Sequence, residues 1–311
     1  MSLKLTRRRF GQLAIAGTAA AGVAYLANKT LAQTPSIVVI GVTPGAPTSI
    51  DDATSTVVDF TDLGENENTT AASTNVGLLL PTFNVATAQP QTPLTTPEGV
   101  NLLSDEELTG FTSLRDGTLV LAVTPVSTSN KDDAPTRLIF LSTPTRTVTV
   151  SGLKKQEKLE SLVGTNENGL LGLVVRKNGQ PPVTLVEINP QTGAVTSSNK
   201  INLPGNERFS NLAQCPDGRL YTTTVGKRGE TSLVQLDLGE KKPVTVAQLQ
   251  FEGNVWNNGL QSLVCSSASQ LFAFGARRYE TPNSLYLVDA TNGSMTKLGE
   301  FDATKVTIAS A

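Results

Sequence analysis

Residues 211–225 read Asn-Leu-Ala-Gln-Cys-Pro-Asp-Gly-Arg-Leu-Tyr-Thr-Thr-Thr-Val, two strand-like segments separated by Pro216-Asp-Gly218. Asp-Gly between such segments predicts a tight β-hairpin, because glycine readily adopts the positive φ that the turn requires. A third strand is expected at 232–237, where apolar and polar residues alternate. The same unit of antiparallel strands recurs along the chain, and this recurrence decides the fold.

The composition favours strands and turns over helices and excludes several kinds of active site. Of the 311 residues, 38% are hydrophobic and 5% are aromatic, and there is no histidine. The absence of histidine excludes a Ser-His-Asp triad, a Cys-His dyad and a zinc site with histidine ligands. No phosphate loop or dinucleotide fingerprint is present, so we expect no cofactor. Any catalysis would depend on carboxylates, Lys, Tyr or an oxygen-bound metal, and the sequence favours a role without catalysis.

The charges are unevenly distributed along the chain. The formal net charge is -2, from 25 basic and 27 acidic residues, but the first 32 residues hold five of the cations and no acid. The remainder therefore carries 20 basic against 27 acidic groups, a net charge of -7. An acidic body without a basic patch argues against nucleic acid or an anionic membrane surface as a partner.

The N-terminal residues resemble a twin-arginine export signal. The segment 6–11, Thr-Arg-Arg-Arg-Phe-Gly, matches the pattern of a hydroxyl residue, two arginines, any residue and Phe through Arg7, Arg8 and Phe10. Gly11 departs from the leucine favoured at the next position. The resemblance implies a protein that folds before it is exported.

An apolar run rich in Ala and Gly follows the arginines over 13–27, about the length of a signal sequence. Small residues precede Gln33, so cleavage is expected there and the signal peptide would span 1–32. The mature protein would then be in the periplasm or an equivalent lumen, or be secreted, without a membrane anchor. An uncleaved N-terminal anchor is the alternative.

Strands comparable to 232–237 recur in a constant register, each apolar at its third and fifth positions. The five copies are 56–61, 137–142, 184–189, 232–237 and 284–289, with spacings of 81, 47, 48 and 52 residues. A second strand precedes each copy, at 37–42, 119–123, 171–175, 220–224 and 271–274. Several of these second strands are apolar on both faces, so we expect them to lie between two layers.

Four strands in a period of about 50 residues are typical of one blade of a β-propeller. The unit 215–221, Cys-Pro-Asp-Gly-Arg-Leu-Tyr, resembles the Ser-Pro-Asp-Gly-x-Leu-Tyr hairpin common to many propeller repeats. Neither a Gly-His with Trp-Asp signature nor a Gly-Gly pair is present, so no functional family is indicated. We therefore expect an all-β, five-bladed propeller over 33–311. Its C-terminal strand, at 304–309, would join the N-terminal blade and close the ring.

The first spacing exceeds the others and predicts an insertion. A Pro- and Thr-rich stretch lies between the copies at 56–61 and 137–142, and we place the insertion near 82–104. Such a composition favours an extended, polyproline-like backbone over a sheet. The insertion would either cover one mouth of the ring or form a solvated connection.

Cys215 and Cys265 lie at the ends of the innermost strands predicted for two adjacent blades. Equivalent positions in neighbouring blades could bring them within disulfide distance, and an exported protein meets oxidising conditions. Two separate, partly buried thiols are the alternative, because a register shift of one residue would point one side chain away. No metal site is expected, since two cysteines without histidine do not make a zinc site.

Two loops of the last blade carry Trp256, Asn257, Arg277, Arg278 and Tyr279. An aromatic ring with amides and guanidinium groups is suited to a carbohydrate or an anionic ligand. In the alternative interpretation, Trp256 packs between blades and the arginines pair with nearby acids.

These features predict an exported, monomeric propeller that acts as a binding or protein-interaction module for an unknown protein or carbohydrate ligand. The alternative is a hydrolase or lyase that uses carboxylates in the channel, with or without calcium. Carboxylates with raised pKa values would then converge on one mouth of the ring. A structural role at the cell surface is a third interpretation, and it predicts no pocket.

Overall fold

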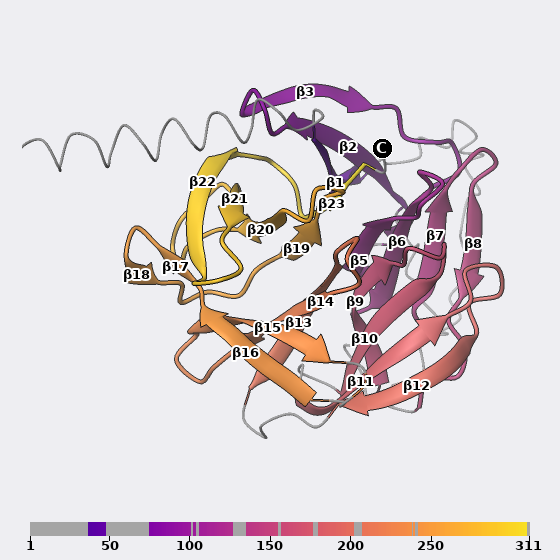
Figure 1. Ribbon diagram of the computed structural model, residues 1–311. Helices are drawn as coiled ribbons and strands as arrows, with labels where there is room; N and C mark the ends of the chain where they lie inside the picture. The colour runs from indigo at the N-terminus through magenta and orange to yellow at the C-terminus, as the bar shows by residue number, and fades with distance from the viewer. Residues whose placement is uncertain are drawn as a thin grey trace, which may run out of the picture.

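Five sheets, each with four antiparallel main strands, are arranged as blades around a central channel in the computed structural model (Figure 1). The structure describes residues 37–47, 75–100, 102–103, 106–126, 135–154, 157–176, 180–201, 207–237, 239 and 242–309. Within these ranges the ordered elements are strands and turns, and no helix is long and apolar enough to cross a membrane.

Each blade has four main strands that run from the channel to the outer edge. In that order they are β23 (Lys305–Ile308), β1 (Val38–Pro47), β2 (Asn75–Asn84) and β3 (Gln89–Leu94) in blade 1; β5 (Glu106–Ser113), β6 (Leu119–Pro125), β7 (Arg137–Leu141) and β8 (Arg146–Thr149) in blade 2; β9 (Glu157–Gly164), β10 (Leu170–Arg176), β11 (Gln180–Ile188) and β12 (Val195–Ile201) in blade 3; β13 (Arg208–Gln214), β14 (Leu220–Val225), β15 (Thr231–Asp237) and β16 (Lys242–Gln248) in blade 4; and β19 (Ser262–Cys265), β20 (Leu271–Gly275), β21 (Ser284–Val288) and β22 (Ser294–Glu300) in blade 5. Short strands extend two blades: β4 (Leu102–Leu103) pairs with β2, and the hairpin β17 (Gln250–Phe251) and β18 (Asn254–Val255) adds to β22.

The ring is closed by pairing between β23 and β1. Val306 lies opposite Gly41 and Thr307 lies opposite Ile40 in an antiparallel ladder. The amide of Val306 also donates a hydrogen bond of 3.0 Å to the Oγ of Ser262, which connects this strand to blade 5. The predicted all-β, five-bladed propeller, closed by a C-terminal strand in the N-terminal blade, is therefore confirmed.

The second strand of most blades is apolar on both faces because it packs against two neighbouring blades; in β14 the buried positions include three threonines. In β6, Val120 and Ala122 belong to the buried cluster between blades 2 and 3, whereas Leu119, Leu121 and Val123 belong to the cluster between blades 1 and 2. One such cluster occupies each of the five interfaces between blades. Since fully burying one Leu or Val side chain contributes about 1.5–3 kcal/mol, these interfaces hold the ring together.

The predicted third strands coincide with β7, β11, β15 and β21 in blades 2 to 5. In blade 1 the prediction was wrong, because the third strand is β2 and the predicted segment 56–61 lies outside the described residues. The sequence favoured 56–61 for this position because that segment matches the register of the other copies, whereas β2 is interrupted by Pro81.

The segment near 82–104 is not the polyproline-like insertion that the sequence predicted. It holds the end of β2, together with β3 and β4, and Pro90 of β3 lies opposite Phe83 of β2. Because β3 is the outermost main strand of its blade, is exposed throughout and pairs with β2 alone, prolines are tolerated in it. Since β3 lies at the outer edge of blade 1, it does not cover a mouth of the ring either. The long connection in blade 1 runs over 48–74, outside the described residues.

Candidate binding sites in the channel and on blade 5

The innermost strands of all five blades line the channel (Figure 1). At its middle the channel narrows to a cavity of about 20 Å³, lined by residues of β5, β9, β13, β19 and β23. A β-carbon at Gly110 would lie 2.7 Å from the Cβ of Leu162, so glycine permits the close approach of blades 2 and 3 at this waist. The channel therefore has two mouths that are separated by packed side chains.

One mouth opens into a cavity of about 440 Å³, which we call the channel-mouth cavity. It lies where the innermost strands end and turn into the second strands. Its floor includes Phe111, Leu162, Leu212 and Leu263, and six hydroxyl side chains stand around them. Those hydroxyls belong to Thr112, Ser113, Thr165, Ser266, Ser267 and Thr307.

Arg115 is the single charged side chain in the described lining of this cavity. Its Nη1 donates a hydrogen bond of 3.2 Å to the carbonyl of Asn166, and the Nδ2 of Asn166 donates one of 3.4 Å to the carbonyl of Pro216. These bonds link blades 2, 3 and 4 around the mouth. The Oε1 of Gln214, which also lines the cavity, is buried without a hydrogen-bond partner among the described residues. The mouth thus offers hydroxyls, amides and one permanent cation.

Cys215 and Cys265 form a disulfide at the same mouth, with their Cα atoms 5.2 Å apart. Cys215 is 1% exposed, whereas Cys265 is partly exposed and lines the cavity. Of the two sequence alternatives, the structure has the disulfide, which joins blade 4 to blade 5. The bond therefore anchors one wall of the channel-mouth cavity.

Charged side chains gather at the opposite end of the channel. The Nζ of Lys158 lies 3.0 Å from the Oε1 of Glu107 and 3.7 Å from the Oε2 of Glu160. The Nζ of Lys305 donates a hydrogen bond of 2.9 Å to the carbonyl of Gln261. The carboxylates of Glu107 and Glu160 are therefore both ion-paired with Lys158.

Burial changes the protonation equilibria at this charged end. It raises the pKa of Glu160, although the cations Lys158 and Lys305 act in the opposite direction. Burial likewise lowers the pKa of Lys305, and the carboxylates of Glu160 and Glu107 oppose that change. Both shifts have the same origin, because each charged form loses hydration in the narrow channel.

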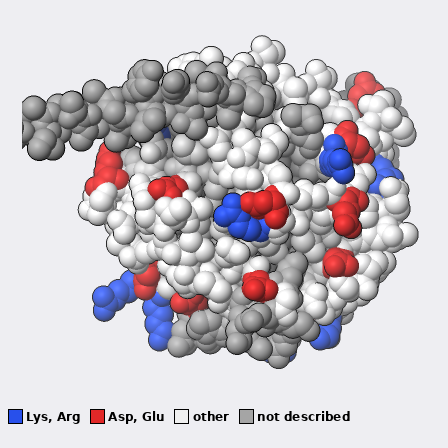
Figure 2. Space-filling model, viewed as in Figure 1, with Lys and Arg blue, Asp and Glu red and all other residues white. Residues whose placement is uncertain are grey.

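Acidic and basic side chains are mixed on the face of the molecule shown in Figure 2, and an acid and a base lie against each other near its middle. No group of three or more His, Cys, Asp or Glu side chains is placed to hold a metal ion within the described part of the chain. Arg7, Arg8 and Phe10 of the export motif lie outside that part.

The five residues of the predicted ligand surface, Trp256, Asn257, Arg277, Arg278 and Tyr279, line a single cavity of about 410 Å³ on blade 5. We call it the blade 5 cavity. It lies between the hairpin β17–β18 and the turn that follows β20, and it shares no lining residue with the channel-mouth cavity.

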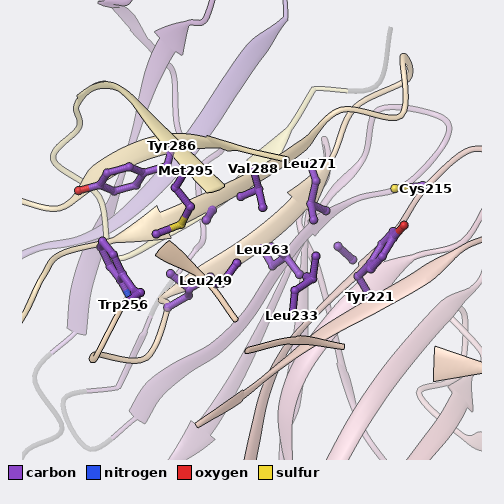
Figure 3. Close-up of a cluster of buried hydrophobic side chains, with 13 residues drawn as sticks. Cys215, Tyr221, Leu233, Leu249, Trp256, Leu263, Leu271, Tyr286, Val288 and Met295 are labelled. Atoms are coloured by element: carbon purple, nitrogen blue, oxygen red, sulfur yellow. The ribbon is translucent and has the colours of Figure 1, made fainter. Parts of the chain in front are cut away.

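Trp256 belongs to the buried cluster between blades 4 and 5 (Figure 3). Its side chain lies beside Tyr286, with ring centroids 5.2 Å apart in an edge-to-face arrangement, and the residue is 2% exposed. Arg277 pairs with Glu252 at 2.9 Å and with Glu280 at 3.7 Å. Trp256 and Arg277 are therefore engaged within the protein, as the alternative interpretation expected.

Apart from Cys265, the residues of the channel-mouth cavity were not identified from the sequence. The turns after β5, β9, β13 and β19 nevertheless share one hydrogen bond, from the amide three residues on to the carbonyls of Leu114, Thr165, Cys215 and Ser266. An alignment of these turns would have placed Arg115, Asn166, Pro216 and Ser267 at equivalent positions around a ring. The repeated turn is therefore the sequence feature that sets the register of this ring of residues.

No family model matches the chain, and a comparison with curated proteins finds no match. Among solved structures, the chain is similar to a protein of unknown function from Dyadobacter fermentans, with a TM-score of 0.48 and 11% identity over 78% of this chain and 77% of that one. A protein of unknown function from Bacteroides caccae gives a TM-score of 0.44 and 10% identity, over 89% and 100% of the two chains. Hydrazine synthase of Kuenenia stuttgartiensis gives 0.40 and 14%, over 65% of this chain and 51% of the other, so this chain spans about half of that one. These likenesses concern the fold alone.

Proposed function

We propose that this protein is an exported binding module whose ligand occupies the channel-mouth cavity. The observation that carries the proposal is that segments from all five blades line one cavity of about 440 Å³. This volume lies within the range of about 300–1,000 Å³ that small-molecule sites have. An apolar floor with hydroxyls and amides above it can hold a polar ligand by hydrogen bonds.

The lining favours a small polar ligand that is neutral or anionic. Arg115 supplies a guanidinium that stays protonated in proteins, so it attracts an anion and cannot act as a general base. The other described side chains in the cavity lack the carboxylate, imidazole or amine that general acid–base catalysis usually requires. Binding without reaction is therefore the function best supported at this mouth.

Two independent features support export. The first is the leader, in which Arg7, Arg8 and Phe10 follow the twin-arginine pattern. The second is the disulfide between Cys215 and Cys265, because such bonds persist mainly in oxidising compartments.

A thermal-shift screen of the full chain tests the binding function, with neutral sugars, amino acids, dicarboxylates, calcium and magnesium as probes. A ligand present at a hundred times its Kd should stabilise the folded state by about 2.7 kcal/mol. Ser267→Trp should abolish that stabilisation, because Ser267 is exposed at the rim and an indole there would fill the cavity. Ala268→Trp is the matched control, since Ala268 is exposed in the same turn but does not line the cavity. Stabilisation that survives Ser267→Trp, or its absence with every probe, would contradict the proposal.

One observation favours the alternative of a hydrolase or lyase, namely the raised pKa of Glu160 at the charged end of the channel. A raised pKa suits a carboxylic acid that acts as a proton donor. Against this function, Lys158 pairs with both Glu160 and Glu107. Product formation from a sugar polymer that is lost in Glu160→Gln, together with stabilisation by calcium, would support the enzyme over the binding module.

A further inference from the structure

The floor of the blade 5 cavity includes Phe251 and Trp256, which both pack edge-to-face against Tyr286 beneath them. The ring of Phe251 lies 5.3 Å from that of Tyr286, which in turn packs against Trp256 at 5.2 Å. The guanidinium of Arg277 lies 4.2 Å from the centre of the Phe251 ring. Because the rings are packed in the interface between blades, the floor keeps its shape without a ligand.

Arg277 positions this floor rather than binding a ligand through its charge. Two carboxylates, those of Glu252 and Glu280, already pair with its guanidinium at 2.9 and 3.7 Å. Arg278 differs, because it is exposed and has no ion pair among the described residues. The uncompensated cation of the blade 5 cavity is therefore Arg278.

Tyr279 presents an unusually exposed aromatic ring at the same cavity. The residue is 90% exposed, and its φ of +71° lies in the left-handed region. That conformation costs about 1 kcal/mol or more in a residue with a side chain, so the surrounding turn must hold it in place. The guanidinium of Arg278 lies 5.1 Å from the centre of the Tyr279 ring. The turn thus holds an aromatic surface and a cation together at the cavity edge.

We propose that the blade 5 cavity binds an acidic sugar, a pyranose that carries a carboxylate. The C–H face of the sugar would pack on the free face of Tyr279, and the carboxylate would pair with Arg278. The exposed side-chain amide of Asn257 would donate hydrogen bonds to the ring hydroxyls and accept hydrogen bonds from them. This site is separate from the channel-mouth cavity, so the proposal does not depend on the function proposed for that cavity.

An acid is favoured over a neutral sugar because Arg278 is exposed and has no ion pair among the described residues, whereas the carboxylates of Glu252 and Glu280 both pair with Arg277. A charge-assisted hydrogen bond to a carboxylate is roughly twice as strong as a neutral one. A single cation fits one carboxylate better than the double negative charge of a phosphate ester. The volume of about 410 Å³ lies within the range of known small-molecule sites.

Isothermal titration calorimetry of the full chain with trimannuronic acid and with its methyl ester tests this proposal, because esterification removes the charge and keeps the rings. The acid should bind at least about tenfold more tightly than the ester. Arg278→Ala should abolish that difference. Tyr279→Ala should weaken binding of the acid about tenfold, whereas Tyr279→Phe should retain it.

Arg219→Ala is the matched control, because Arg219 is also a surface arginine that lies over a tyrosine ring, at 5.8 Å from the centre of Tyr221, but it is outside the blade 5 cavity. It should leave the affinity unchanged. Equal affinities for acid and ester, no binding of the acid, or binding that is insensitive to Arg278→Ala and Tyr279→Ala would each overturn the proposal.

Discussion

Replacing Cys215 and Cys265 by alanine should lower the free energy of unfolding by about 4 kcal/mol. The disulfide closes a loop between residues 50 positions apart, so its loss allows the unfolded chain many more conformations. In the chain-entropy model a loop of this length corresponds to about 4 kcal/mol at 25 °C. Alanine is preferable to serine because Cys215 is 1% exposed, and a buried hydroxyl without a partner would add a cost of its own.

Urea unfolding followed by fluorescence measures this loss, because the one tryptophan of the chain, Trp256, packs in the interface that the disulfide joins. With a denaturant slope of about 1–3 kcal/mol/M, the midpoint should fall by at least about 1 M. Reducing the wild-type protein should give the same midpoint as the double variant, and reductant should not change the variant. The two substitutions change few native contacts, so the entropy of the unfolded chain is the main effect that they test. A fall in the midpoint of less than about 0.3 M would therefore refute the loop-entropy reasoning.

Three further predictions concern the ring, the charged channel end and the leader. Val306→Asp should destabilise the protein by more than about 3 kcal/mol, because it places an unpaired charge at a position that is 1% exposed; an unchanged melting temperature would contradict this. Since burial raises the pKa of Glu160, its contribution to stability is complete below the usual value of 4.5 and is lost as the pH rises through the folded pKa. The difference in unfolding free energy between wild type and Glu160→Gln should therefore change with pH between the usual pKa and the folded-state pKa, and be constant above the latter. A difference independent of pH would refute the raised pKa of Glu160. Changing Arg7 and Arg8 to Lys should retain the protein in the cytoplasm on cell fractionation, and unimpaired export would show that the leader works by another route.

The blades could be predicted because four of their third strands share one register, in which the third and fifth positions of each copy are apolar. β7, β11, β15 and β21 follow that pattern, and their spacings of 47, 48 and 52 residues defined the repeat. β2 and β3 break it, one with a run of leucines and the other with prolines. β3 is an outer strand, which needs neither a fixed pattern nor a full set of amide donors, whereas β2 pairs on both sides and departs from the pattern at Pro81.

The candidate sites were predictable to different degrees. Arg277, Arg278 and Tyr279 are adjacent in sequence, and one turn suffices to place them at the same cavity as Trp256 and Asn257. The channel-mouth cavity draws its lining from five segments spread over the chain, so its shape depends on the register of every blade. The charge pairs at the other end of the channel depend on the same register. Sequence patterns within one blade contain no information about side chains from the next.

The pairing of β23 with β1 has a consequence for synthesis on the ribosome. β1 ends at Pro47 and its partner begins at Lys305, so at about 5–20 residues per second the first strand waits on the order of ten to fifty seconds for its neighbour. During that time the nascent polypeptide has an open strand edge that other chains could join, and a ribosome stalled in blade 5 would leave it so. Holding factors that shield such an edge would therefore raise the yield of native protein more than factors that accelerate the folding of single hairpins.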